Sequence, residues 1–199
     1  MKAIHAHFIK QDPILYSYIC KTGELEPIEK DSPDNYFFRL CREIIGQQLS
    51  NASSDAIIKR FEALFGNTFP KPSDILPVPH EKLRAVGMSN AKARYVRNLA
   101  EAVVNKTIRM HELDDMNDER IIEELTKVKG IGPWTAEMFL IFVLGREDVF
   151  SMGDLALRKA IKRLYGFKKE PTNKQTEKII RTWTPYKTYG SRILWQSLE

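Results

Sequence analysis

Hydrophobic residues recur along this chain with the spacing of one helix face. Residues three or four positions apart lie on the same side of an α-helix, whereas strand residues alternate with a period of two. The helical spacing is clearest in four sets: Phe37, Leu40 and Ile44; Ile57, Phe61 and Leu64; Ile121, Leu125 and Val128; Leu157, Ile161 and Leu164. Strand-like alternation is scarce. The pattern therefore predicts an all-α protein of short helices.

Glycine and proline punctuate these helical segments at short intervals. They occur at Gly46, Gly66, residues 69–79 (FPKPSDILPVP), Gly87, Gly130, Gly132, Gly153 and Gly166. Such residues favour turns, so we expect short connections and no flexible linker. Helix starts are marked by cap residues: Ser89 or Asn90 before residues 91–104, and Asp118 before residues 121–128.

The stretch LTKVKGIGPWTA, residues 125–136, predicts two helices that meet at a tight corner. Gly130 stops a helix that ends at Val128, and Pro133 occupies the first position of the next helix, where its missing N–H costs nothing. A Gly-x-Gly turn at a helix N-terminus exposes backbone N–H groups that can receive phosphate oxygens. The alternative is a plain corner between helices, which needs the same glycines.

Composition narrows the class of protein further. The 199 residues carry 31 Lys and Arg against 26 Asp and Glu, a net charge of +5, which favours polyanionic partners without proving one. The two cysteines, Cys20 and Cys41, are too few for a disulfide framework or a multi-cysteine metal site. We find neither a signal-type start nor an apolar run that could span a bilayer, so we expect an intracellular protein off the membrane.

Three segments in order resemble the base-excision DNA glycosylases of the helix-hairpin-helix superfamily, and more narrowly the 3-methyladenine DNA glycosylase II family. They are residues 42–61 (REIIGQQLSNASSDAIIKRF), 128–161 (VKGIGPWTAEMFLIFVLGREDVFSMGDLALRKAI) and 182–195 (TWTPYKTYGSRILW). The hairpin alone occurs in many DNA-binding proteins, but the hairpin with an aspartate at this offset is specific.

The resemblance implies an all-α fold of two lobes with the active site in the cleft between them. Residues 36–146 would form a central lobe that holds the hairpin, and residues 1–35 plus 147–199 a second lobe built from both chain ends. Some family members carry an additional N-terminal β-rich domain, for which this chain is too short. It resembles a minimal member.

Asp154 matches the catalytic aspartate of that family. The residues alone favour another role, because Ser151 and Asp154 form an S-x-x-D box at the start of a helix, where an acid stabilises the helix dipole. Asp148 matches no catalytic position, and we interpret it as a loop residue.

The resemblance also assigns the damaged-base pocket and the reaction type. Relatives that cut the DNA strand carry a lysine nucleophile where this chain has Trp134, so a monofunctional enzyme with water as nucleophile is implied. Trp134, Met138 and Trp195 fall on positions that line the family's base pocket, where aromatic rings favour cationic bases. Core packing is the alternative for both tryptophans.

A flipped nucleotide leaves a gap in the duplex that a side chain can fill. The resemblance puts this wedge at Gln48 in GQQLS, with Leu49 beside it. The alternative is a pair of glutamines, Gln47 and Gln48, at the exposed end of a helix.

Phosphate anchoring is expected from the amides of Gly130 and Gly132, aided by Lys129. Relatives bind a monovalent cation, Na⁺ or K⁺, through main-chain carbonyls of the hairpin. The matching carbonyls here belong to Thr126, Val128 and Ile131. No other cofactor is required.

The expected function is that of a monofunctional DNA glycosylase, acting as a monomer on duplex DNA that contains alkylated purines of the 3-methyladenine and 7-methylguanine type. It would reside in the cytoplasm of a bacterium or archaeon, or in a eukaryotic nucleus. Two alternatives stay open: a glycosylase for a deaminated or oxidised base, and a non-catalytic helix-hairpin-helix module that only binds DNA.

Overall fold

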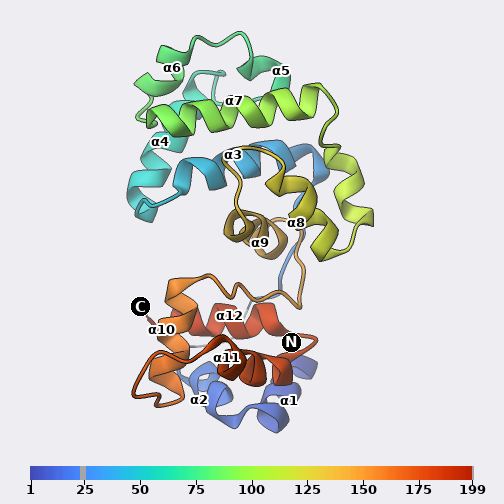
Figure 1. The fold of residues 1–199 in the computed structure, drawn as a ribbon, viewed down its shortest axis with the longest axis vertical. Coiled ribbons are helices and arrows are strands. Elements are labelled where there is room, and N and C mark those ends of the chain that lie inside the picture. The colour runs from blue at the N-terminus through green and yellow to red at the C-terminus, as the bar shows by residue number, and fades with distance from the viewer. Residues whose placement is uncertain (23–25, 199) are drawn as a thin grey trace. The chain divides into compact units, whose positions relative to one another are not determined.

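A computed structural model describes residues 1–22 and 26–198, with residues 20–22 described by their backbone alone. The chain forms two compact units (Figure 1). One unit comprises Asp31–Leu144, and the other combines Met1–Lys30 with Gly145–Glu199. The sequence placed the corresponding boundaries at 35/36 and 146/147, a few residues away.

The unit Asp31–Leu144 is built around helix α3. Its helices are α3 (Tyr36–Gly46), α4 (Asn51–Ala63), α5 (Pro72–Ile75), α6 (His80–Ala85), α7 (Asn90–Val104), α8 (Asp118–Thr126) and α9 (Pro133–Phe142). Helix α3 packs against α4, α7 and α9, and α8 packs against α9. Phe37, Leu40 and Ile44, the first predicted apolar set, are all buried in this unit, so α3 contributes its hydrophobic face to the core.

The second unit joins both ends of the chain in one hydrophobic core. Its helices are α1 (Lys2–Gln11), α2 (Pro13–Thr22), α10 (Leu155–Leu164), α11 (Asn173–Ile180) and α12 (Lys187–Gln196). Phe8 and Leu15 from the N-terminal helices share a core cluster with Trp183 and Ile193. Helix α12 contacts both α2 and α10.

A buried carboxylate ties this second core together. Asp12 is 6% exposed and accepts hydrogen bonds from the Leu15 backbone N–H at 3.0 Å, from Trp183 Nε1 at 2.7 Å and from the Tyr165 hydroxyl. A buried carboxylate is tolerated when donors satisfy it in this way. The three donors connect α2, the region before α12, and the end of α10.

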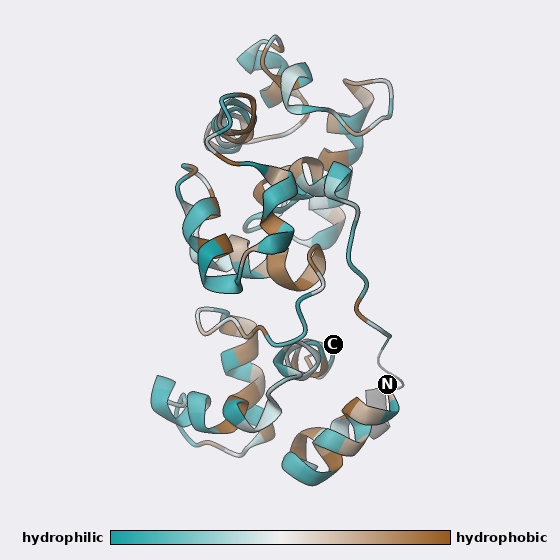
Figure 2. Ribbon diagram, turned by 90° about the vertical axis from the view of Figure 1, so that its right-hand side faces the viewer, coloured by the Kyte–Doolittle hydropathy of each residue, from teal (hydrophilic) through white to brown (hydrophobic). Residues whose placement is uncertain are grey.

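The all-helical fold predicted from the sequence is confirmed, and secondary structure in the described ranges contains no strand. Most helices carry hydrophobic and hydrophilic residues on opposite sides (Figure 2), as expected for helices that cover a core. Within the ranges 1–22 and 26–198, no helix has the length and apolarity needed to cross a membrane.

The predicted helix caps are correct for α7 and one residue off for α8. Ser89 caps α7, accepting a hydrogen bond from the Lys92 N–H. The cap of α8 is Asn117, which accepts from the Arg120 N–H at 2.9 Å, and Asp118 is the first helical residue. The observed positions suit both residues, because Asn is a strong N-cap and an acidic side chain in the first turn interacts favourably with the helix dipole.

Candidate active-site and DNA-binding residues

The hairpin between α8 and α9 has the predicted corner, with one difference in where the first helix ends. Helix α8 ends at Thr126, two residues before the predicted Val128, and the chain then turns through residues 127–132. Gly132 is the N-cap of α9 and Pro133 is its first residue, as predicted. The backbone amides that follow Gly132 therefore lie at the positive end of a helix dipole.

The two glycines of this turn are needed for different reasons. Gly130 has a φ of 115°, and an added Cβ would lie 2.3 Å from Cγ of Tyr95, so both backbone and packing require glycine. Gly132 has an ordinary φ of −96°, and an added Cβ would meet nothing within 4 Å. The fold thus does not require glycine at 132, whereas close approach of a ligand to the backbone would.

Side chains from α7 and from the turn between α3 and α4 bind the carbonyls of Lys129 and Gly130. Asn98 of α7 donates to the Lys129 carbonyl at 3.1 Å, and Gln47 donates to the Gly130 carbonyl at 3.0 Å. Lys129 itself is exposed. These bonds fix the backbone of the turn, so its amides are held in place before any ligand binds.

The carbonyls expected to hold a monovalent cation belong to Thr126, Val128 and Ile131. The Val128 carbonyl accepts the Ile131 N–H at 3.0 Å. A carbonyl oxygen has two lone pairs, and uncharged oxygens suit a hard cation. The donor set therefore fits Na⁺ or K⁺.

Asp154 occupies the N-cap of α10, in the other unit. Its side chain is almost completely buried, and Oδ1 accepts the Leu157 N–H at 2.8 Å. The expected S-x-x-D box is shifted, because Asp154 itself is the cap and its own N–H donates to the Ser151 carbonyl at 3.2 Å. This cap fixes the carboxylate, and the dipole of α10 stabilises negative charge there.

Trp195 lies beside this carboxylate. Its Nε1 donates to Asp154 Oδ1 at 3.5 Å, and the ring packs half-buried against the core of its unit. Asp154 and Trp195, which the sequence assigned to the site, are 41 positions apart in the chain and lie side by side in the structure. Asp148, the competing acid, instead binds Lys187 through the backbone N–H at 3.2 Å and Nζ at 3.0 Å.

Trp134 and Met138 follow the hairpin on α9 and differ in exposure. Trp134 is 40% exposed, which is unusual for a tryptophan and fits a binding surface. Met138, four residues later, is 4% exposed and is part of the buried core, so it offers a ligand far less surface than Trp134.

The candidate wedge residues lie in the turn between α3 and α4. Gln48 is exposed and has a φ of 58°, a backbone conformation that few non-glycine residues adopt outside special sites. Leu49 is 38% exposed. It lines a cavity of about 370 Å³ whose other walls include Trp134 and Glu43. Burial raises the pKa of the Glu43 carboxyl, and the nearby Arg39 and Arg42 partly offset this.

Two residues hold this turn in a way that the sequence did not predict. Lys92 of α7 donates from Nζ to the carbonyls of Ile45 at 2.9 Å and Gln47 at 2.7 Å. The Gln47 side chain reaches the hairpin, as described above. Gln47 stood beside a residue already singled out, but nothing in the sequence revealed a partner 83 positions away.

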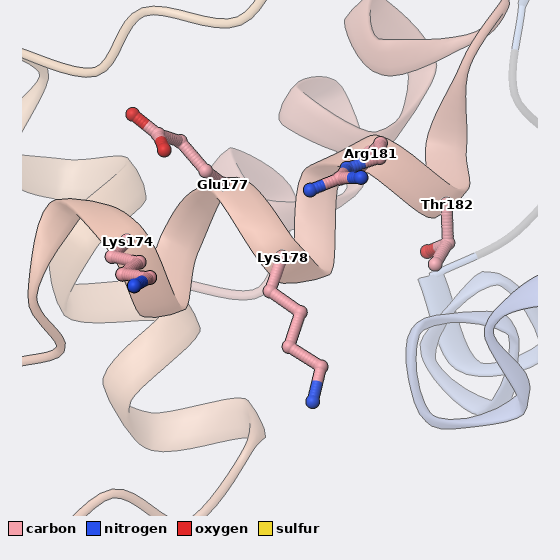
Figure 3. Close-up of a pocket in the computed structure, with 5 residues that line it drawn as sticks. All are labelled: Lys174, Glu177, Lys178, Arg181 and Thr182. Carbon is pink, nitrogen blue, oxygen red and sulfur yellow. The ribbon is translucent and has the colours of Figure 1, made fainter.

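A surface cavity along α11 carries none of the sequence-assigned residues. Its volume is about 530 Å³, and it is lined by Lys174, Glu177, Lys178, Arg181 and Thr182 (Figure 3). Figure 3 shows Glu177 and Lys178 pointing to opposite sides of the helix. Charged residues at helical spacing on an exposed helix are typical of a solvated face, and we assign this cavity no role.

A helical protein with a Gly-x-Gly turn at the start of one helix and a buried carboxylate capping another has the features of the helix-hairpin-helix class. The chain belongs to the HhH-GPD superfamily of base excision DNA repair proteins, whose model matches residues 41–186. The family resemblance inferred from the sequence is therefore confirmed.

Individual relatives match over nearly the whole chain. An alkylbase DNA glycosidase-like protein of Schizosaccharomyces pombe is 34% identical over 98% of this chain and 92% of its own length. A solved structure of the S. pombe 3-methyladenine DNA glycosylase Mag1, in complex with abasic DNA, is 31% identical. It covers 98% of this chain and 96% of its own, with a TM-score of 0.88. A DNA-3-methyladenine glycosidase from Bacillus halodurans is 37% identical and covers 96% of this chain and 86% of its own, with a TM-score of 0.82.

Proposed function

We propose that this protein is a monofunctional DNA glycosylase that hydrolyses the N-glycosidic bond of alkylated purines in duplex DNA and leaves an abasic site. The observation that carries the proposal is Asp154, a buried carboxylate with one oxygen fixed by a helix cap, in a chain of this repair family. Named 3-methyladenine DNA glycosylases among its relatives support the alkylated purine as the substrate class.

Release of an alkylated purine needs little general-acid catalysis but strong electrostatic stabilisation of the sugar by a carboxylate. An alkylated purine already carries positive charge, so it departs without a strong proton donor. The sugar becomes oxocarbenium-like, and a fixed carboxylate stabilises that charge and orients the attacking water. Asp154 has one oxygen engaged by the Leu157 N–H and Trp195, which holds the carboxylate in one orientation. Such preorganisation avoids a reorganisation cost during the reaction.

Water is the nucleophile in this proposal because the hairpin offers an indole instead of an amine. Strand cutting through a Schiff base needs a lysine nucleophile. Trp134 occupies that position at the start of α9. The product is thus an intact strand with an abasic site.

DNA is held, in this proposal, by the hairpin and opened by the turn before α4. The amides at Gly130 and Gly132, with Lys129, bind phosphate, and Gln48 or Leu49 fills the gap left by the flipped nucleotide. In this proposal Trp134, Met138 and Trp195 keep the base-pocket role that the family resemblance assigns to them. A monovalent cation at the carbonyls of the hairpin would add positive charge beside the phosphate. The enzyme acts as a monomer wherever the DNA lies, in a prokaryotic cytoplasm or a nucleus.

The substitution Asp154→Asn tests the catalytic assignment without disturbing the fold. Asn caps a helix about as well as Asp, so unfolding free energy changes by less than about 1 kcal/mol. Loss of the charge lowers the rate of base release by about 10²- to 10³-fold, by analogy with other electrostatic catalysts. The assay uses methylated duplex DNA, with each released base identified by chromatography.

The control is Asp148→Asn, which removes a charge six residues away that binds Lys187. It should release base at the wild-type rate. Full base release by Asp154→Asn, with unchanged binding to lesion DNA, would show that Asp154 is not catalytic. Release of a deaminated or oxidised base alone would favour another lesion. Binding without any release by the wild-type protein would favour the non-catalytic module, and breaks in the product strand without alkali would refute the monofunctional assignment.

A further inference from the structure

The turn that carries Gln48 is held by side chains on two sides. From α7, Lys92 donates to the carbonyl of Ile45 in the last turn of α3 and to that of Gln47, the C-cap of α3. A cation at the C-terminus of a helix neutralises the negative end of its dipole, so this contact fixes where α3 stops. It does not, however, connect the turn to the hairpin.

Gln47 makes that connection. Its Nε2 donates to the Gly130 carbonyl at 3.0 Å and to Thr135 Oγ1 at 3.1 Å. A side-chain amide nitrogen has two hydrogens, and both acceptors belong to the hairpin or the first turn of α9. Thr135 is 3% exposed, so its hydroxyl is a fixed acceptor. The bonds therefore tie the backbone at residue 47 to the structure that presents the phosphate-binding amides.

The neighbouring residue is the one with the unusual backbone. Gln48 has a φ of 58°, and a conformation of this kind persists only where the surroundings hold it. Gln47 is bonded through its side chain to the hairpin and through its carbonyl to Lys92. Gln47 therefore helps to hold this conformation, together with the Leu49 N–H, which donates to the Gly46 carbonyl at 3.1 Å across the turn.

We propose that Gln47 is a positioning residue that fixes the Gln48 turn on the hairpin, so that phosphate binding and insertion into the duplex occur at a set distance. This inference rests on the proposed function. If it holds, Gln47 matters for extruding the damaged nucleotide from a paired helix and not for the hydrolysis that follows.

The variant Gln47→Met separates these two steps, because it keeps the length of the side chain and removes both donors. The substrates are two duplexes with the same 7-methylguanine, one paired with cytosine and the other opposite an abasic site, where pairing is already lost. Base release is measured under single-turnover conditions. The loss of two neutral hydrogen bonds should slow release from the paired duplex by about tenfold or more. Release from the duplex with the abasic site should change by less than about twofold.

The control is Gln11→Met, the same substitution on an exposed glutamine at the end of α1. It should leave both rates unchanged. Thr135→Val provides a second variant that removes one of the two acceptors with little change in volume, and it should lower the paired-duplex rate by a smaller factor. This variant decides the matter if Gln47→Met does not fold.

Equal slowing on both duplexes would overturn the positioning role, since damage to the fold or to the catalytic group affects both substrates alike. An unchanged rate on the paired duplex would overturn it too. The failure of the proposed function gives a different result, in which the wild-type protein releases no base from either duplex.

Discussion

The two glycines of the hairpin should respond to the same substitution in opposite ways. Gly130→Ala should damage the fold, and Gly132→Ala should damage DNA binding while leaving the fold nearly intact. The reason lies in their surroundings, since Tyr95 lies against Gly130 and the space beside Gly132 is open.

The magnitudes follow from the geometry of each position. An alanine at a φ of 115° adopts a disfavoured conformation, which costs about 1–2 kcal/mol. Its Cβ would also lie 2.4 Å from the Cβ of Tyr95, and such overpacking costs a further 1–3 kcal/mol or so. Gly130→Ala should therefore lower the unfolding free energy by roughly 2–5 kcal/mol. Gly132→Ala changes only an N-cap, which costs about 1 kcal/mol or less.

We expect the binding effect of Gly132→Ala to come from its new methyl group, which would occupy the open space beside the amides proposed to bind phosphate. A hydrogen bond to a charged group is worth about 1.5–3 kcal/mol, so the loss of one should weaken binding roughly tenfold to a hundredfold. Urea denaturation measures the unfolding free energy. Fluorescence anisotropy with a duplex carrying an abasic-site analogue, at one fixed salt concentration, measures the affinity.

Two results would refute this reasoning. Wild-type affinity in Gly132→Ala would mean that phosphate does not approach this helix end. Wild-type stability in Gly130→Ala would mean that neither the positive φ nor the Tyr95 contact constrains the turn.

Two further predictions concern the unit that contains Asp154, and a third concerns Cys41 of α3. Asp12→Ala leaves Trp183 Nε1 and other buried donors without their acceptor, so the unfolding free energy measured in urea should fall by about 2–4 kcal/mol. A change below about 1 kcal/mol would show that the hydrogen bonds to Asp12 do not stabilise this core. Trp195→Phe keeps an aromatic ring but removes the donor to Asp154, so base release should slow by about threefold to tenfold with binding nearly retained; an unchanged rate would show that this bond does not orient the carboxylate. Burial raises the pKa of the Cys41 thiol well above its usual range, so in the folded protein this thiol stays protonated at pH values where an exposed thiol ionises. Its alkylation by iodoacetamide, followed by mass spectrometry of its peptide, should be slow in buffer and rapid in urea; rapid labelling in buffer would place the thiol at the surface.

Local signals in the sequence were sufficient for the helices and for part of the site. The apolar spacing that predicted a helix around Leu40 reflects burial on α3, and Pro133 begins α9 because proline is tolerated at that position. Asp154 lies at the start of α10, as its residue type suggested. It is itself the N-cap, whereas the expected S-x-x-D box began at Ser151. These predictions succeeded because each depends on residues within a few positions of one another.

Contacts between distant segments could not be predicted in the same way. The need for glycine at 130 arises from Tyr95, and the fixed carbonyls of the turn depend on Asn98 and Gln47, which lie 31 and 83 residues from their partners. The burial of Met138 could not be predicted either. Its position matches one that lines the family's base pocket, but that match does not indicate how much of the side chain is exposed.

Under the proposed function, the hairpin uses some of its backbone groups to hold the fold and others to bind DNA. Its carbonyls at Lys129 and Gly130 accept hydrogen bonds from the side-chain amides of Asn98 on α7 and of Gln47 in the turn before α4. The first N–H groups of α9 lack acceptors within their own helix. A phosphate that binds them gains fixed donors without paying to order a loop. In our proposal the bond from Gln47 to the Gly130 carbonyl also sets the position of Gln48, so that one side chain would serve both the phosphate anchor and the wedge. It follows that a hairpin transplanted without residue 47 would bind phosphate but would not direct insertion at a defined nucleotide.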